Sequence, residues 1–201
     1  MARFILRQSS NVTGMIKEFI EDSISVKKAL LEDENFIKAI QEAIDLLINC
    51  FKNGNKILIA GNGGSAADSQ HFAAEIVCKF KKQRKAYPAL ALTDNSSIIT
   101  AWSNDYDFKS VFSRQIEAFA KPGDIFIGIS TSGNSENIIS GVSKAKEMGL
   151  KTICLLGRDG GKLKNRADIT LIVHSNDTPR IQEAHIMLIH IICEQVEKNF
   201  S

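Results

Sequence analysis

The chain has 201 residues, of which 44% are hydrophobic, and this suits one α/β domain with a full core. Its formal net charge of +2 and the lack of a long basic block argue against nucleic acid as a partner. The apolar run at the start is too short for a signal peptide, and no stretch has the roughly 18 apolar residues of a membrane span, which predicts a cytoplasmic protein without a membrane partner.

Two amphipathic helices are expected before any strand, over residues 11–31 and 34–52, because apolar side chains recur there at helical spacing. Asp33 is the expected N-cap of the second helix, and Gly54 marks its end. We expect the two helices to form a hairpin. Its apolar surface has little else to pack on, so it is a candidate subunit interface.

Residues 56–60 predict a buried strand, because they form a short apolar, β-branched run. Gly61, Gly63 and Gly64 follow and allow the backbone to approach a ligand closely, and Ser65 is the expected cap of the next helix. The N–H groups at a helix start attract anions, most often phosphate. This turn is therefore a candidate phosphate-type site.

On the helix after this turn, His71 and Glu75 are four residues apart and project from one face. They suggest an acid–base or metal-binding pair. The turn also fits a relaxed dinucleotide fingerprint, with Asp94 as the acid that would bind a ribose. Against that alternative, Asp94 lies well beyond the roughly 20 residues expected between fingerprint and acid.

Four further apolar stretches predict strands, over residues 88–93, 124–130, 152–156 and 169–173. Helices are expected over residues 96–102 and 111–120, from the turn after the third strand to residue 149, and over residues 180–199. Polar loops are expected over residues 104–107 and 157–168.

Alternating strands and helices predict a doubly wound, five-stranded parallel sheet flanked by helices, with ligands bound at the carboxyl ends of the strands. Residues 1–201 would form a single domain, with 1–54 as the leading helices and 55–201 as the α/β core. The four cysteines lie in apolar segments without a C-x-x-C spacing, which predicts reduced, buried thiols.

A second polar turn follows the third strand and carries four hydroxyl groups, on Ser130, Thr131, Ser132 and Ser135. Together with the N–H groups of a helix start, they can hold a terminal phosphate without lysine or metal. For any one of them, an ordinary helix N-cap is the alternative. Four within six residues favour a phosphate site.

The last helix is apolar on nearly all sides and must be buried, so its polar side chains need partners. At about 100° per residue, Gln182 and His190 lie on similar faces, whereas His185 points elsewhere. Glu183 aligns with His190 equally well, so spacing alone does not choose between Gln182 and Glu183.

Five stretches together resemble the sugar isomerase (SIS) domain family: GNGGSAADSQHFAAE (61–75), SNDYDF (103–108), GISTSGNSENII (128–139), GRDGGKL (157–163) and TPRIQEAHIMLIH (178–190). The likeness runs from about residue 10 to the end and is strongest to members that act on a phosphorylated seven-carbon sugar. It implies isomerisation of sedoheptulose 7-phosphate to D-glycero-D-manno-heptose 7-phosphate, which feeds lipopolysaccharide core or capsule. It also implies a homotetramer with sites shared between subunits.

By motif match, the acid–base residues would be Glu75 and His190. One zinc ion per subunit, with no nucleotide cofactor, would be bound by His71, Glu75, Gln182 and His190. The phosphate would be held by Ser130, Thr131, Ser132 and Ser135. The sugar would be lined by Asn62, Gly63, Gly64, Ser65, Asn104 and Asp105.

Aldose–ketose isomerisation moves a proton between C1 and C2 through an enediol, and a carboxylate with an imidazole is sufficient for it. One departure from the family pattern is Cys78-Lys79 where relatives commonly have Gly-Arg; lysine keeps the charge but not the bidentate geometry. The competing hypothesis is a non-catalytic SIS-domain binding protein that regulates replication initiation. The presence of Glu75 and His190 argues against it.

Overall fold

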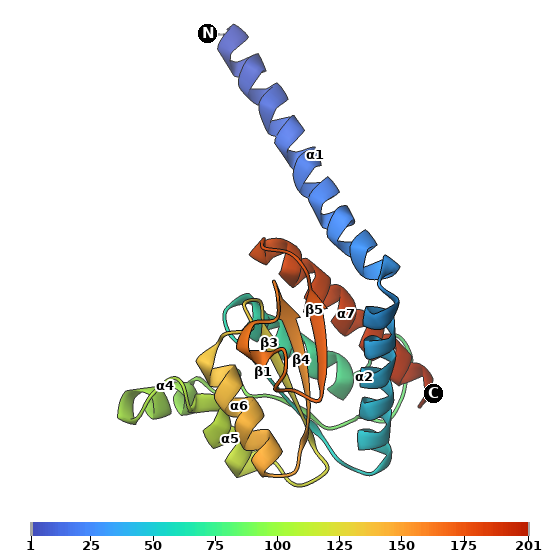
Figure 1. Ribbon diagram of the computed structural model, residues 1–201, viewed down its shortest axis with the longest axis vertical. Helices are drawn as coiled ribbons and strands as arrows, with labels where there is room; N and C mark the ends of the chain where they lie inside the picture. Colours follow the sequence, from blue (N-terminus) through green and yellow to red (C-terminus); the bar gives the residue numbers. More distant parts are fainter. Residues whose placement is uncertain (1, 201) are drawn as a thin grey trace.

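The computed structural model describes residues 2–200, with side chains from residue 12 onward. Its centre is a five-stranded, all-parallel sheet of order β2-β1-β3-β4-β5 (Figure 1). The strands are β1 (Ile57–Gly61), β2 (Ala89–Ala91), β3 (Ile125–Ser130), β4 (Lys151–Gly157) and β5 (Ile169–Val173). The predicted doubly wound sheet is confirmed, and the chain reverses its direction across the sheet between β1 and β3.

Both faces of the sheet are covered by helices, which explains why the strands read as continuous apolar runs. Along β1, Ile57 and Ile59 face one hydrophobic cluster while Leu58 and Ala60 face the other. The first cluster contains residues of α2 (Glu34–Lys52), α3 (Gly64–Val77) and α7 (Thr178–Lys198). The second contains residues of α5 (Val111–Phe119) and α6 (Glu136–Glu147).

The first helix, α1 (Ala2–Glu32), is longer than predicted and runs away from the rest of the molecule (Figure 1). It does not fold back along α2, so the predicted hairpin is wrong in shape although both helices are present. Leu30 is buried near its end. Over the earlier turns, large apolar side chains are exposed, namely Val12, Met15, Ile16, Phe19, Ile20 and Ile24.

Local chemistry sets several helix boundaries. Asp33 caps α2 as predicted, its carboxylate accepting the N–H groups of Asn35 and Phe36 at 3.0 Å each. Asn95 likewise caps α4 (Ser96–Asp105). That helix extends over the first two residues of the polar loop expected at 104–107, and a short 3-10 helix, η1 (Gly161–Leu163), lies within the second expected loop.

Pro88 precedes β2, which lies at the edge of the sheet, where a missing N–H costs no ladder hydrogen bond. Three cysteines are buried as predicted, but Cys78 is exposed because α3 ends at Val77. None of the helices in the described part of the chain is long and apolar enough to span a membrane.

Candidate active site

The two predicted turns meet at the point where the chain reverses direction across the sheet. β1 and β3 are neighbours in parallel register, with Gly61 opposite Ile129. The side-chain amides of Asn62 and Asn137 exchange two hydrogen bonds, of 2.9 and 2.8 Å. These bonds join the turn after β1 to the first turn of α6, so both turns lie at the switch point of the sheet, where folds of this class bind ligands.

The start of α3 is built from glycine rather than capped by a side chain. Gly63 is the N-cap at a φ of 56°, so the prediction that Ser65 caps this helix is wrong. Ser65 is instead buried in the first turn, where its carbonyl accepts the hydroxyl of Ser69 at 2.8 Å. The positive end of the helix dipole therefore lies at this switch point without a capping side chain.

Close packing explains why residues 61 and 64 are glycines. A Cβ added at Gly61 would lie 2.3 Å from the carbonyl oxygen of Ser65, so the turn lies directly against its own helix. A Cβ added at Gly64 would lie 2.3 Å from Nε2 of Gln182. Only a glycine allows Gln182, from α7, to reach the start of α3 in this way.

Three polar side chains meet between α3 and α7. Nε2 of His71 lies 3.2 Å from Oε1 of Glu75 and 3.2 Å from Nε2 of His190. The imidazole rings of the two histidines are 5.2 Å apart between centroids. His71 and Glu75 thus share a face of α3 as predicted, and α7 brings His190 to them from the other end of the chain.

The other polar residues of α7 have separate partners. Glu183 accepts a hydrogen bond from Nη2 of Arg180 at 2.5 Å, whereas Gln182 lies against Gly64. His185 is fully buried, and its Nε2 pairs with the carbonyl oxygen of Leu156 at 3.0 Å. Burial lowers the pKa of His185 to about 4, so it is a neutral core residue, as its position on the helix suggested.

The hydroxyl groups of the second turn are partly tied to one another. Oγ of Ser130 lies 2.9 Å from Oγ of Ser135, the N-cap of α6. Oγ of Ser132 accepts the N–H of Asn134 at 3.1 Å, which leaves its own O–H to donate. Thr131 and Ser132 are half-buried at the mouth of the turn. The turn therefore offers hydroxyl donors in a fixed arrangement.

Asn104 and Asp105 lie elsewhere. Both are exposed at the end of α4, a helix without buried residues that projects from the body of the molecule (Figure 1). Asn104 donates to Asp105 at 2.9 Å. Among the hydrogen bonds and ion pairs of the described side chains, none joins this pair to His71, Glu75 or His190.

Four residues of this region were not predicted from sequence: Phe80, Arg84, Asn137 and Glu197. Asn137 lies inside a motif already recognised, so its side-chain amide was a usable signal. Arg84 and Glu197 are 113 residues apart, and no local pattern links them.

The donor set of the His71 cluster suits zinc, which binds imidazole nitrogen and carboxylate oxygen. His71 and His190 supply two imidazole nitrogens and Glu75 supplies a carboxylate. Gln182 carries an amide about two turns before His190 on α7. Within the described residues, however, no group of three or more His, Cys, Asp and Glu is already arranged to hold a metal. The residue types suit zinc, and in this structure the side chain of His71 is close enough to hydrogen-bond directly to those of Glu75 and His190.

A model of the SIS domain matches residues 18–157. The chain belongs to the SIS domain family. A relative from Clostridium acetobutylicum named phosphoheptose isomerase is 56% identical over 185 residues, which are 92% of this chain and 94% of the relative. Another of that name, from Helicobacter pylori, is 49% identical over 185 residues, 92% of this chain and 95% of the relative.

Two solved structures are similar over almost the whole length of this SIS-domain chain. The phosphoheptose isomerase of Neisseria gonorrhoeae has a TM-score of 0.81 at 41% identity, covering 94% of this chain and 98% of its own. A phosphoheptose isomerase from Francisella tularensis has a TM-score of 0.88 at 36% identity, covering 92% and 98%. The family predicted from the motifs is therefore confirmed.

Proposed function

We propose that the protein is a phosphoheptose isomerase, which converts sedoheptulose 7-phosphate to D-glycero-D-manno-heptose 7-phosphate. The observation that carries this is that His71 links a carboxylate and an imidazole, on Glu75 and His190. The same helix α3 starts at the glycine-rich turn, which is joined to the hydroxyl-rich turn by Asn62 and Asn137. The relatives reported above bear that name at identities of 56% and 49% over most of the chain.

The proposed reaction begins with the phosphate on the second turn, where Ser130, Thr131, Ser132 and Ser135 supply hydroxyl donors. The sugar extends along Asn62, Gly63, Gly64 and Ser65 toward α3 and α7. These assignments rest on the position of the turns at the carboxyl ends of adjacent strands. The other end of the substrate then reaches the cluster around His71.

Glu75 then removes a proton from C1, the ketose oxygen O2 takes up a proton, and an enediol forms. Collapse of the enediol releases the proton of O1 and returns a proton from Glu75 to C2, giving the aldose. His190 moves the hydroxyl proton between O1 and O2. His71, hydrogen-bonded to His190, holds the imidazole ring in place.

Zinc is the proposed metal, one ion per subunit, and its ligands would be His71, Glu75, Gln182 and His190. A bound ion polarises the substrate carbonyl and makes the adjacent C–H more acidic. Glu75 is a weaker base while it is a ligand, so base and ligand are roles that it takes in turn. Metal analysis of the purified protein, with and without chelator, tests this assignment.

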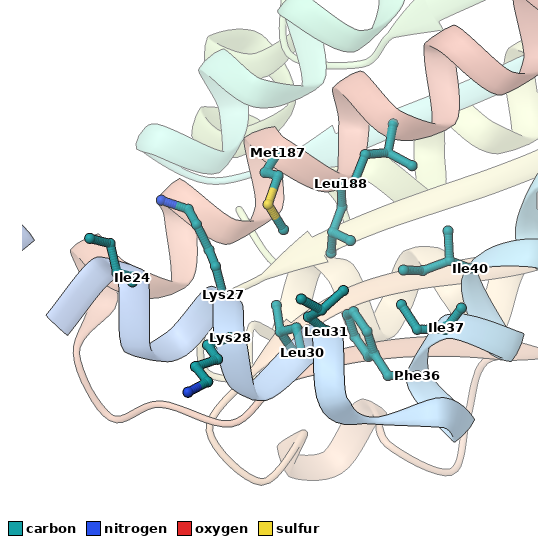
Figure 2. Close-up of a pocket in the computed structure, with 11 residues that line it drawn as sticks. Ile24, Lys27, Lys28, Leu30, Leu31, Phe36, Ile37, Ile40, Met187 and Leu188 are labelled. Atoms are coloured by element: carbon teal, nitrogen blue, oxygen red, sulfur yellow. The ribbon is translucent and has the colours of Figure 1, made fainter. Parts of the chain in front are cut away.

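We also propose a homotetramer whose sites are shared between subunits. A groove of about 610 Å³ between α1, α2 and α7 is lined almost entirely by apolar side chains, including Leu31, Ile37, Met187 and Ile191 (Figure 2). A second copy of the chain can cover it and the exposed face of α1. Asn104 and Asp105, which project away on α4, would then line the sugar in a neighbouring subunit's site.

The product would supply heptose for lipopolysaccharide core or capsule. A cytoplasmic location is proposed, since four free cysteines suit a reducing compartment. The competing hypothesis, a non-catalytic regulator of replication initiation, receives no support from the relatives reported above, which are named as isomerases.

Incubation of the purified protein with sedoheptulose 7-phosphate tests the proposed function directly. Aldose phosphate should accumulate to an equilibrium mixture, and in deuterated water the product should carry deuterium at C2, because the enediol exchanges its proton with solvent through the base. A protein that binds the sugar phosphate without turning it over would instead support the non-catalytic alternative.

A further inference from the structure

The connection between α3 and β2 is folded around one buried carboxylate. Glu197, near the end of α7, accepts the backbone N–H groups of Phe80 at 2.9 Å, Lys81 at 2.7 Å and Lys82 at 2.9 Å. Its side chain is only 3% exposed. A carboxylate that accepts several backbone N–H groups is strongly stabilised in its charged form.

Arg84 completes this arrangement from within the same connection. Its Nε lies 3.2 Å from Oε1 of Glu197, and its side chain is also 3% exposed. Burial raises the pKa of Glu197, but the three N–H groups and the guanidinium outweigh that effect and hold the pKa below its ordinary value. Both Glu197 and Arg84 are therefore charged, and hydrogen bonds compensate for the burial of the carboxylate.

The remaining nitrogens of Arg84 contact the end of α3. Nη2 donates to the carbonyl oxygen of Glu75 at 2.8 Å, and Nη1 donates to that of Ile76 at 2.9 Å. α3 ends at Val77, so these carbonyls belong to the last turn and have no partner within the helix. A cation at this end also interacts favourably with the helix dipole.

Phe80 links the carboxylate of Glu197 to His190. Its N–H is held by Glu197, and its ring centroid lies 5.6 Å from that of His190, at an interplanar angle of 39°. The imidazole of His190 therefore contacts both the ring of Phe80 and His71.

We infer that Arg84 and Glu197 are positioning residues, which hold Glu75 through its own backbone and His190 through Phe80. The pair thereby sets the distance between the two acid–base groups although neither residue belongs to the His71 cluster. The catalytic consequence rests on the proposed function. The structural consequence is that the His190 ring should be displaced when the pair is disrupted, and this does not rest on the proposed function.

The test uses Arg84→Lys, which keeps the charge opposite Glu197 but offers one nitrogen where the guanidinium offers three. We expect kcat to fall by about tenfold to a hundredfold, since a misplacement of about 1 Å has that effect, with KM changed by less than about threefold. Phe80→Leu keeps the N–H and removes the ring. It should lower kcat in the same way and shift the NMR signals of the His190 ring.

Asp124→Asn is the matched control. Asp124 is also a buried carboxylate that accepts two backbone N–H groups, from Lys56 and Lys121, and pairs with a cation, but it lies before the first residue of β3. Among the hydrogen bonds and ion pairs of the described side chains, none joins it to Glu75 or His190. The control should lower the melting temperature and leave kcat per folded molecule unchanged. A purely structural role for Arg84 would give the same result as the control.

Two readouts separate this inference from the proposed function. If the wild-type protein does not isomerise heptose phosphate, but Arg84→Lys still shifts the His190 ring signals at equal metal content, the function fails and the positioning role stands. If the wild type is active, and Arg84→Lys retains kcat within about twofold with unshifted His190 signals, the positioning role is overturned.

Discussion

His71 faces two partners with a single ring nitrogen. Its Nε2 lies 3.2 Å from both Glu75 and His190, and one N–H can be donated along only one of these lines. When Nε2 donates to Glu75 it cannot donate to His190, and the reverse also holds. A proton gained or lost by either partner therefore changes the hydrogen bond that His71 offers to the other.

Glu75→Gln should abolish turnover while leaving the fold intact, because the amide has nearly the shape of the carboxylate but cannot accept the C1 proton. The expected loss in kcat is at least the roughly 10² to 10⁴ of a positioned base. Glu183→Gln is the control, since Glu183 pairs with Arg180 on the same helix as His190. Activity of Glu75→Gln within about tenfold of the wild type would remove Glu75 from the role of base.

Ser132→Ala should act on binding rather than on chemistry. Its hydroxyl would bind the phosphate equally in the ground state and the transition state, so KM should rise by about tenfold with kcat nearly unchanged. Steady-state kinetics measure both. Ser143→Ala, which removes a hydroxyl bound to the carbonyl of Ile139 on the exposed side of α6, should change neither. A fall in kcat at constant KM would mean that the turn is misassigned.

His185 makes stability depend on pH. Burial lowers its pKa to about 4 in the folded protein, against about 6.5 in an unfolded chain, so between these values the unfolded chain binds the extra proton. The free energy of unfolding should fall by roughly 3 kcal/mol as the pH falls from about 6.5 to about 4. Urea denaturation across this range measures the slope. His185→Gln should have a smaller slope, and an equal slope in both proteins would contradict the assignment.

At the scale of elements, the contact between α3 and α7 depends on Gly64. Gly64→Ala would place a Cβ 2.3 Å from Nε2 of Gln182, and that flexible side chain can move aside without disturbing the helix. We expect an unchanged melting temperature with activity and zinc content both lowered, activity by about tenfold. In a cycle with Gln182→Ala, the two losses should not add. Additive losses would show that Gly64 acts by another route.

The regular elements could be predicted because each has a local cause. Residues 169–173 form β5 over the predicted range, and Asp33 caps α2 as expected. Boundaries failed where two local signals compete. Ser65 has the chemistry of an N-cap, but Gly63 takes a φ of 56° that few other residues adopt, so the helix begins two residues earlier than the serine indicates.

The site could be predicted only where its residues lie in short motifs. His71 and Glu75 share a helix face, and helical geometry alone places them together. Spacing could not distinguish Gln182 from Glu183, because their different surroundings come from Arg180, which pairs with Glu183, and from Gly64, against which Gln182 lies. Contacts between distant segments leave no periodic trace in the sequence.

At the scale of the whole molecule, the proposed assembly rests mainly on α1. Phe19 and Ile24 are each 58% exposed on a helix that extends away from the sheet (Figure 1). A closed assembly of several copies would bury them, as most soluble oligomers bury such faces by symmetry. The exposed apolar face of α1 therefore supports the proposed assembly of several copies.

Phe19→Glu and Ile24→Glu should each lower oligomer size and activity together, since a charge in an apolar interface opposes assembly and the sites would be shared. Light scattering measures the first and the isomerase assay the second. Lys17→Glu, a change of charge at an exposed polar position of the same helix, is the control. A variant that is both monomeric and fully active would show that one chain holds a complete site.

The bonds that complete the site join very distant parts of the chain, and this constrains the order in which the protein can be made. Asn62 must wait for Asn137, which is 75 residues further on, and Phe80 must wait for Glu197, which is 117 residues further on. During synthesis the strand of the first turn leaves the ribosome early, but its parallel neighbour β3 does not yet exist. Until residue 197 has left the ribosome, the loop that carries Phe80 has no carboxylate to fold around, so the candidate site stays incomplete until the end of α7 has been made.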